Sequence, residues 1–430
     1  MTRRGALVYT EGNDRTWPEG TDMPIPISLR LGACLGLGLL AGCGAAPAPE
    51  NVAPVASGGG YQAQYRDPPR QSDDAVYLVS ARMNAERCRP AAGGPAGSGK
   101  AAGAVQAARA LRGERLSRND LVDVRVGDDE TFNGDYVISR DGMLKLPFLP
   151  PIPAQGRRPE DVEADLARLL VREELYDTAP RISVRTADFA SVNVAVSGAV
   201  FEPHSVEIGG LSAENIDRAR QGALGASTEA RNLSAAIRAA GGVRPDADLS
   251  AIALYRNGRK HVLDLRGVFE GRHAVDVMLL TGDEIVVPSR QCFQDDLMRP
   301  SPVSPPGVSL FLSNLTQPAT GNAPSAVGRD VRQVPYGTRF MQAVVDTNCV
   351  GGARATSAHR SAVLFTRNPV TGVSIVIERQ IEDQLRRADR DDFDPYLLPG
   401  DAIACYDSSV TNVAEAARVV GAVGAVALMR

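Results

Sequence analysis

Apolar and polar residues alternate along Asp120-Leu-Val-Asp-Val-Arg-Val126, as they do in a β-strand with one buried face. A second stretch, Asn133-Gly-Asp-Tyr-Val-Ile-Ser-Arg-Asp-Gly142, contains another apolar run and ends in a turn signal. We expect a hairpin here, with Tyr136–Ser139 pairing with Leu144–Leu146 across the turn. The two stretches predict the start of a small sheet.

A helix and a further strand complete this unit. Pro159 suits the first position of a helix, because the amide of that position has no partner within the helix. One helical face is apolar, with Val162, Leu166, Leu169 and Leu170. Ile182–Arg185 then alternates again and predicts a strand. We therefore expect an α+β domain over residues 116–190.

These motifs resemble the polysaccharide export domain of the Wza-like outer-membrane polysaccharide export family. The resemblance rests on five segments in the family's order, with the predicted helix between the last two: Asn119–Val124, Asn133–Gly142, Leu146-Pro147, Gly156–Glu160 and Pro180–Val184. Asn119 stands where the family usually has Gly. Pro150-Pro151 occupies the place of another common Gly, so we expect the loops to differ from the family pattern.

Two later stretches echo each other, Leu279-Leu-Thr-Gly-Asp-Glu-Ile285 and Leu397-Leu-Pro-Gly-Asp-Ala-Ile403. Each follows a predicted helix and a predicted strand: Leu233–Gly242 and Ala253–Gly258 in the first case, Phe340–Val344 and Val363–Asn368 in the second. Such a repeat implies tandem domains of one fold. The order resembles the soluble-ligand-binding β-grasp module of these exporters. Pro300–Pro306 is the expected hinge between the two copies.

The N-terminal segment predicts secretion. Arg30 precedes an apolar run, Leu31–Ala41, that is too short to span a bilayer. Leu40-Ala-Gly-Cys43 resembles the bacterial lipobox, which implies acylation of Cys43; the alternative is a plain signal peptide with an incidental cysteine. Gly44 stands where an Asp often retains lipoproteins at the inner membrane, so the outer membrane is expected.

Four cysteines follow the acylated one: Cys88, Cys292, Cys349 and Cys405. They allow three complete pairings, and the sequence does not choose among them. Their spacing contains no C-x-x-C, which favours structural disulfides or buried thiols over a metal or redox motif.

Charge and composition exclude several functions. The formal net charge is -4, with both signs interspersed, so no nucleic-acid partner is expected. The four histidines show no His-x-x-x-His or His-Glu-x-x-His pairing, and we predict no catalytic residue, metal site or cofactor. Gly94–Lys100 has P-loop spacing, but Ala101 stands where that motif needs Ser or Thr.

The last segment, 411–430, has helical composition and no Pro. A helix of this length would extend roughly 28 Å at about 1.5 Å per residue, close to the apolar thickness of a bilayer. One stripe is polar or small and is the expected pore-lining face: Asn412, Glu415, Arg418 and Ala422. The alternative is a helix docked on the preceding module.

Together the segments predict a multidomain α+β protein. The expected parts are a signal peptide over 1–42 with its true start at Met23, a lipidated tether over 43–115, an export domain over 116–190, β-grasp modules over 191–290 and 307–408, and a membrane helix over 411–430. The resemblance implies a non-enzymatic channel subunit for capsular polysaccharide or exopolysaccharide, assembled as a homo-oligomeric ring, an octamer in the family. An inner-membrane polysaccharide co-polymerase is the implied partner. The alternative is a periplasmic lipoprotein adaptor that forms no pore.

Overall fold

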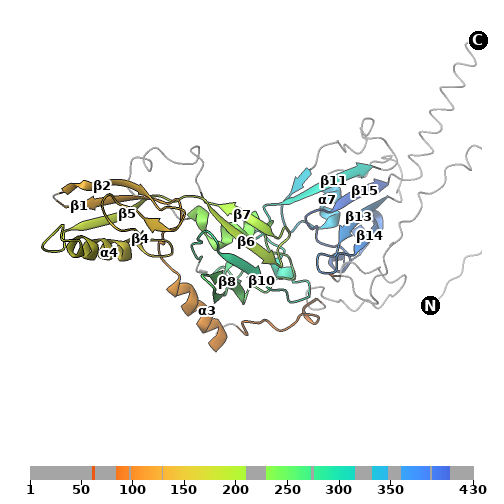
Figure 1. Ribbon diagram of the computed structural model, residues 1–430. Coiled ribbons are helices and arrows are strands. Elements are labelled where there is room, and N and C mark those ends of the chain that lie inside the picture. Colours follow the sequence, from red (N-terminus) through yellow and green to blue (C-terminus); the bar gives the residue numbers. More distant parts are fainter. Residues whose placement is uncertain are drawn as a thin grey trace, which may run out of the picture. The chain divides into compact units, whose positions relative to one another are not determined.

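The structure is a computed structural model, shown in Figure 1. It describes residues 61–62, 84–95, 98–127, 129–209, 229–272, 276–314, 332–346, 360–387 and 390–406. All of them fall within one compact unit, Pro47–Thr411. Helices and several separate sheets are present, which confirms the α+β multidomain class.

The first sheet has three antiparallel strands in the order β2-β1-β5. The strands are β1 (Leu121–Val126), β2 (Asp129–Val137) and β5 (Ile182–Asp188). Helix α4 (Pro159–Arg172) packs against β5 and buries the predicted apolar face. Asp161 accepts a hydrogen bond from the Arg158 amide at 3.3 Å, which caps the helix start. Burying one such Leu or Val contributes about 1.5–3 kcal/mol.

The predicted turn at Arg140–Met143 is confirmed, because the Ser139 amide donates to the Met143 carbonyl at 2.9 Å across it, but the predicted strand pairing of Tyr136–Ser139 with Leu144–Leu146 is wrong. Strand β2 instead pairs with β1, through Gly134–Val137 and Asp129, and β3 (Met143–Leu144) pairs with β4 (Ile152–Pro153). Gly142 turns the chain with a φ of 79°, and its carbonyl accepts the amides of Ala154 and Gln155, both at 2.9 Å. These bonds direct the chain after the turn toward β4 and away from β2.

Two five-stranded sheets follow, and they have the same strand order. The first is β7-β6-β10-β8-β9 and the second is β12-β11-β15-β13-β14. In each sheet the central strand runs parallel to one neighbour and antiparallel to the other. The strands of the first are β6 (Val192–Gly198), β7 (His204–Ile208), β8 (Ile252–Arg256), β9 (Arg259–Leu263) and β10 (Glu284–Val287). Those of the second are β11 (Val308–Asn314), β12 (Arg332–Val334), β13 (Ser361–Arg367), β14 (Ser374–Gln380) and β15 (Ala402–Tyr406).

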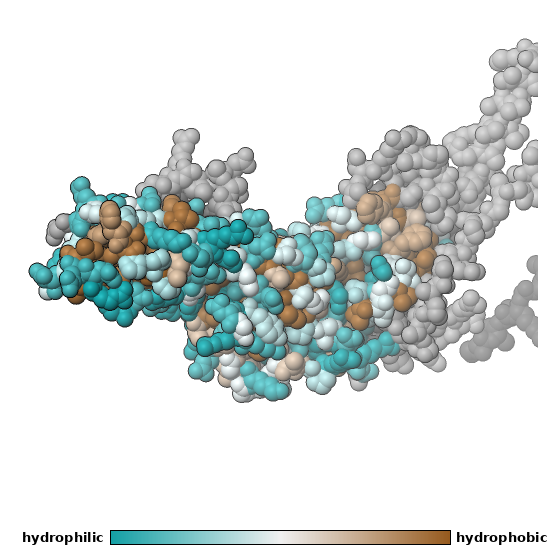
Figure 2. All heavy atoms as spheres, in the orientation of Figure 1, coloured by the Kyte–Doolittle hydropathy of each residue, from teal (hydrophilic) through white to brown (hydrophobic). Residues whose placement is uncertain are grey.

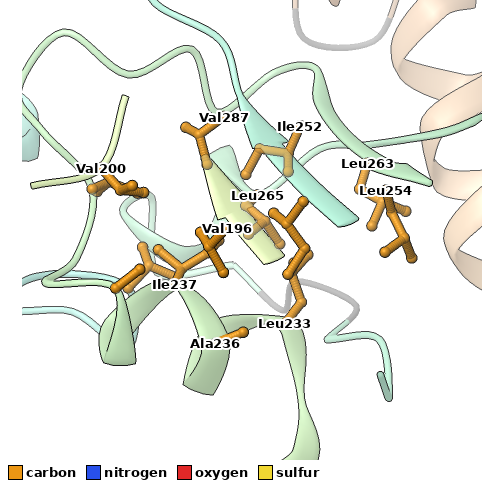
Figure 3. Close-up of a cluster of buried hydrophobic side chains, with 14 of the residues drawn as sticks. Val196, Val200, Leu233, Ala236, Ile237, Ile252, Leu254, Leu263, Leu265 and Val287 are labelled. Atoms are coloured by element: carbon orange, nitrogen blue, oxygen red, sulfur yellow. The ribbon is translucent and has the colours of Figure 1, made fainter. Parts of the chain in front are cut away.

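Each sheet has its own helix and hydrophobic core. Helix α6 (Leu233–Ala239) packs on the first sheet, where Leu233, Ala236 and Ile237 join the buried cluster of Figure 3. Helix α7 (Phe340–Asp346) contributes Phe340, Ala343 and Val344 to the second core. The remaining short helices are α8 (Ile381–Arg386) and the 3-10 turns η3 (Glu229–Arg231), η4 (Arg266–Val268), η5 (Asp295–Leu297) and η7 (Arg390–Asp392).

The two helices begin in the same way. The Ser234 amide donates to Asp276 at 3.1 Å, and the Met341 amide donates to Asp394 at 2.9 Å. In both copies a carboxylate distant in sequence therefore replaces the usual N-cap residue. The same hydrogen bond at the second residue of both helices supports an origin of the two modules by internal duplication.

Part of the segment predicted as a flexible tether is ordered. Helix α3 (Gly99–Ala110) packs against β9 and buries Ala101, Ala104 and Ala108. The Gly93 amide donates to Ser250 Oγ at 2.9 Å, and a Cβ at Gly93 would lie 2.1 Å from the Ser250 carbonyl oxygen. The Ala, Gly and Ser composition that suggested flexibility instead permits close packing.

Candidate functional site: three buried aspartate turns and the export-domain loop

A turn of one geometry occurs immediately before β1, β10 and β15. In each turn the residue before an Asp has a left-handed backbone, with a φ of 68° at Asn119, 90° at Gly282 and 91° at Gly400. Asn tolerates this region better than most residues other than Gly. The departure from the family pattern at Asn119 therefore preserves the turn.

The carboxylates of these turns are buried and bind the backbone behind them. Each Asp accepts the amide three residues earlier: Asp120 from Ser117 at 2.6 Å, Asp283 from Leu280 at 2.9 Å and Asp401 from Leu398 at 2.9 Å. None of the three residues is more than 2% exposed. A buried charge is costly unless it is paired or hydrogen-bonded, so the partners of each carboxylate determine its pKa and its effect on stability.

Asp120 receives its partner from the neighbouring module. Arg231, which precedes α6, places one guanidinium nitrogen 2.7 Å from the Asp120 carboxylate, with both side chains buried. Arg231 also donates to the Leu279 carbonyl at 3.0 Å and lies over the Phe189 ring at 5.1 Å. Burial raises the pKa of Asp120, and Arg231 opposes that rise. This ion pair joins the export domain to the first five-stranded sheet.

The buried carboxylate of this turn has different partners in the two repeats. In the first, Arg256 forms a 2.6 Å ion pair with Asp283. In the second, strand pairing places Thr366 at the position of Arg256, and its side chain hydrogen-bonds Asp401. Burial without a cationic partner raises the pKa of Asp401 to about 7.

Stability should therefore depend on pH through Asp401. Its folded pKa of about 7 exceeds the ordinary value of 3.8, so the folded state retains a proton that the unfolded state loses. Stability from this group falls as the pH rises from about 4 to about 7, by on the order of 4 kcal/mol.

Asp401→Asn cannot ionise and retains an acceptor for the Leu398 amide. We expect the variant to match the wild type at pH 4 and to melt at a higher temperature at pH 8. Thermal melts at both pH values, with the exposed Asp383→Asn as control, measure the difference. An unchanged gap between wild type and variant across this pH range would refute the assignment.

The second feature of the site is exposed and consists of the turn at Ser139–Gly142 and the loop after β3. The single proton of the Ser139 hydroxyl is shared between the Met143 carbonyl oxygen, at 2.6 Å, and the Asp141 carboxylate, and Lys145 pairs with Asp141 at 2.9 Å. Hydrogen bonds from Ser139 and Lys145 lower the pKa of Asp141 to about 2. Nearby, Phe148 is 88% exposed with a φ of 62°. The sequence interpretation overlooked Phe148, although an aromatic residue between Pro147 and Pro150-Pro151 is a detectable signal.

The remaining predicted positions are distributed as follows. Cys43 lies outside the described residues, and so do the expected pore-lining residues, Asn412, Glu415, Arg418 and Ala422. Within the described ranges, no helix is both long and apolar enough to cross a membrane. The same ranges contain no cluster of His, Cys, Asp and Glu that could hold a metal ion. His204 is exposed, and its Nδ1 lies 2.6 Å from the Glu202 carbonyl oxygen.

One cysteine pairing is now defined. Cys88 forms a disulfide with Cys292, which fastens the segment before α3 to the end of the first repeat. The adjacent Arg89 amide donates to the Arg290 carbonyl at 2.9 Å. Cys405 is also disulfide-bonded. Disulfides are typical of an oxidising compartment such as the periplasm.

Comparison with known proteins identifies the first module. Residues 109–187 match the polysaccharide biosynthesis/export protein family. The chain therefore carries a polysaccharide export domain, and the resemblance predicted from its motifs is confirmed. This match supports a role in polysaccharide export. No curated protein matches the sequence significantly.

Proposed function

We propose that the protein is an outer-membrane lipoprotein that assembles into a homo-oligomeric channel for the export of capsular polysaccharide or exopolysaccharide. The family match over residues 109–187 carries the proposal. The matched region contains the three-stranded sheet, α4 and the Asp120 turn. Export is a transport function, and the chain would carry out no catalytic step in it.

The anchor in this proposal is Cys43, preceded by the signal segment 1–42. The Cys88–Cys292 disulfide supports passage into an oxidising compartment. The modules over 191–290 and 307–408 then act as β-grasp domains, supported by their identical strand orders. Fatty-acid labelling of the wild type and of Cys43→Ser tests the anchor, because label retained by the variant contradicts it.

The lumen-facing surfaces of several copies would line the channel, and the segment 411–430 of each copy would cross the outer membrane. An eight-membered ring and an inner-membrane polysaccharide co-polymerase as partner are proposed from the family resemblance. The face in Figure 2 is largely hydrophilic over the described residues, with several hydrophobic patches between the hydrophilic areas. Polar surfaces suit the walls of a hydrated conduit, because a passing polymer must not be held tightly.

Electron microscopy of the detergent-extracted, full-length lipoprotein distinguishes the proposed channel from the alternative, an adaptor that forms no pore. We expect closed rings with a central lumen. Single particles without a lumen, from membranes that export normally, would instead support the pore-free adaptor. Cys43→Ser extracted in parallel controls for assembly that depends on the lipid anchor.

A further inference from the structure

Lysine is rare in this chain, and two of its three lysines line the same hollow. Among 47 basic residues only three are Lys: Lys100, Lys145 and Lys260. Lys100 is on α3 and Lys260 is on β9, far apart in sequence, yet both line one hollow. Lys145 lies elsewhere, paired with Asp141.

The hollow lies between α3 and β9, which is an edge strand of the first five-stranded sheet. Its volume is about 510 Å³. Gly103 and Ala104 form the helical wall, and a Cβ at Gly103 would meet no atom within 4 Å. The small side chains of α3 therefore leave room for a ligand the size of one or two sugar residues beside the lysines.

The hollow is positively charged. His261 joins the two lysines in its lining, which contains no carboxylate. Among the described carboxylates, none lies within ion-pair distance of Lys100 or Lys260. The Lys260 ammonium lies 5.9 Å from the Tyr255 ring centre, an attraction that leaves its N–H groups open to solvent. Burial lowers the pKa of His261 and Arg256 lowers it further, opposed by Asp283, so the positive charge of the hollow comes from the two lysines and His261 offers a ring N–H donor.

We propose that this hollow binds an anionic sugar, through Lys100, Lys260 and His261. The charge on that sugar is a carboxylate or a phosphate, since both present oxygens that accept N–H donors. An ammonium is a compact point charge with rotatable donors, which suits a ligand that arrives in more than one orientation. The assignment rests on the proposed function, and it makes an acidic polysaccharide the exported class.

Lysine footprinting tests the site directly, because three lysines give three clean signals. The full-length lipoprotein in detergent would be acetylated briefly with a lysine-selective reagent, alone or with oligogalacturonate, inorganic phosphate or neutral maltohexaose. At a ligand concentration about ten times the Kd, we expect acetylation of Lys100 and Lys260 to slow about ten-fold. Lys145 should react unchanged and serves as the internal control.

The probes separate the two sources of charge. Protection by oligogalacturonate alone assigns a carboxylate sugar, and protection by phosphate assigns a phosphorylated one. Protection by neither anion, or equal protection by maltohexaose, would overturn the proposal. In calorimetry, Lys100→Gln/Lys260→Gln should weaken binding of the protecting anion at least about ten-fold, whereas Lys145→Gln should not. An equal loss in Lys145→Gln would also overturn it.

Failure here is distinguishable from failure of the proposed function. Export by a strain that lacks the protein is measured without reference to this hollow. If export needs the protein but no anion protects the lysines, only the anionic-sugar site is wrong. If anions bind but export proceeds without the protein, the site stands and the channel does not.

Discussion

Replacing Arg231 by Met should destabilise the folded chain by about 3–5 kcal/mol, since it leaves the Asp120 carboxylate buried without its cation. The ion pair is 2.7 Å long and almost wholly removed from water. The carbonyls of Leu279 and Ala190 would also lose a donor. Urea unfolding of the mature chain, followed by circular dichroism, gives the shift of the transition midpoint.

Arg238→Met is the matched control, because Arg238 is exposed on the neighbouring helix α6. It should change the stability by no more than about 0.5 kcal/mol. Adding Asp120→Asn to Arg231→Met should recover part of the loss, because the uncompensated charge is removed. Equal effects of the two Arg variants would show that the ion pair does not hold the junction.

Removing residues 411–430 should reduce surface polysaccharide to the level of a strain without the protein. The proposed pore helix would be absent, whereas the last described strand, β15, ends earlier at Tyr406. Immunoblotting, protease resistance and the Cys88–Cys292 disulfide would show that the remaining modules are folded. Normal export by the truncated chain would place the pore elsewhere or favour the adaptor.

Single cysteines along the same segment refine this result. At Asn412, Glu415, Arg418 and Ala422 we expect labelling by water-soluble reagents, because a charged side chain facing lipid is costly. Cysteines at Val413 and Val420 should remain protected. Uniform labelling of both sets would contradict a spanning helix with one polar face.

The sequence predicted local features well, because each depends on nearby residues. Helix α4 follows from Pro159 and its apolar spacing, and it forms with the predicted buried residues. The echo of Gly282-Asp283 in Gly400-Asp401 corresponds to one turn geometry that requires a left-handed residue before a buried carboxylate. Such short motifs carry their structural reason within a few residues.

Features that join distant segments escaped prediction. Arg231 and Asp120 are 111 residues apart, and nothing near either one announces the other. Lys100 lay in a stretch whose composition suggested a tether, yet α3 packs on β9. The hairpin error has a similar origin, because the strand ending near Ser139 could pair with either Leu144–Leu146 or β1. It pairs with β1, which is more distant in sequence.

The most direct test of the export role compares polysaccharide outside and inside the cell, with and without this protein. In a strain that lacks the gene, surface and released polymer should disappear, and expression of the wild-type chain should restore both. The Asp383→Asn variant, altered at an exposed residue of α8, should restore them equally, as a control for expression of an altered chain. Normal amounts of surface and released polymer in the strain without the protein would contradict the export role.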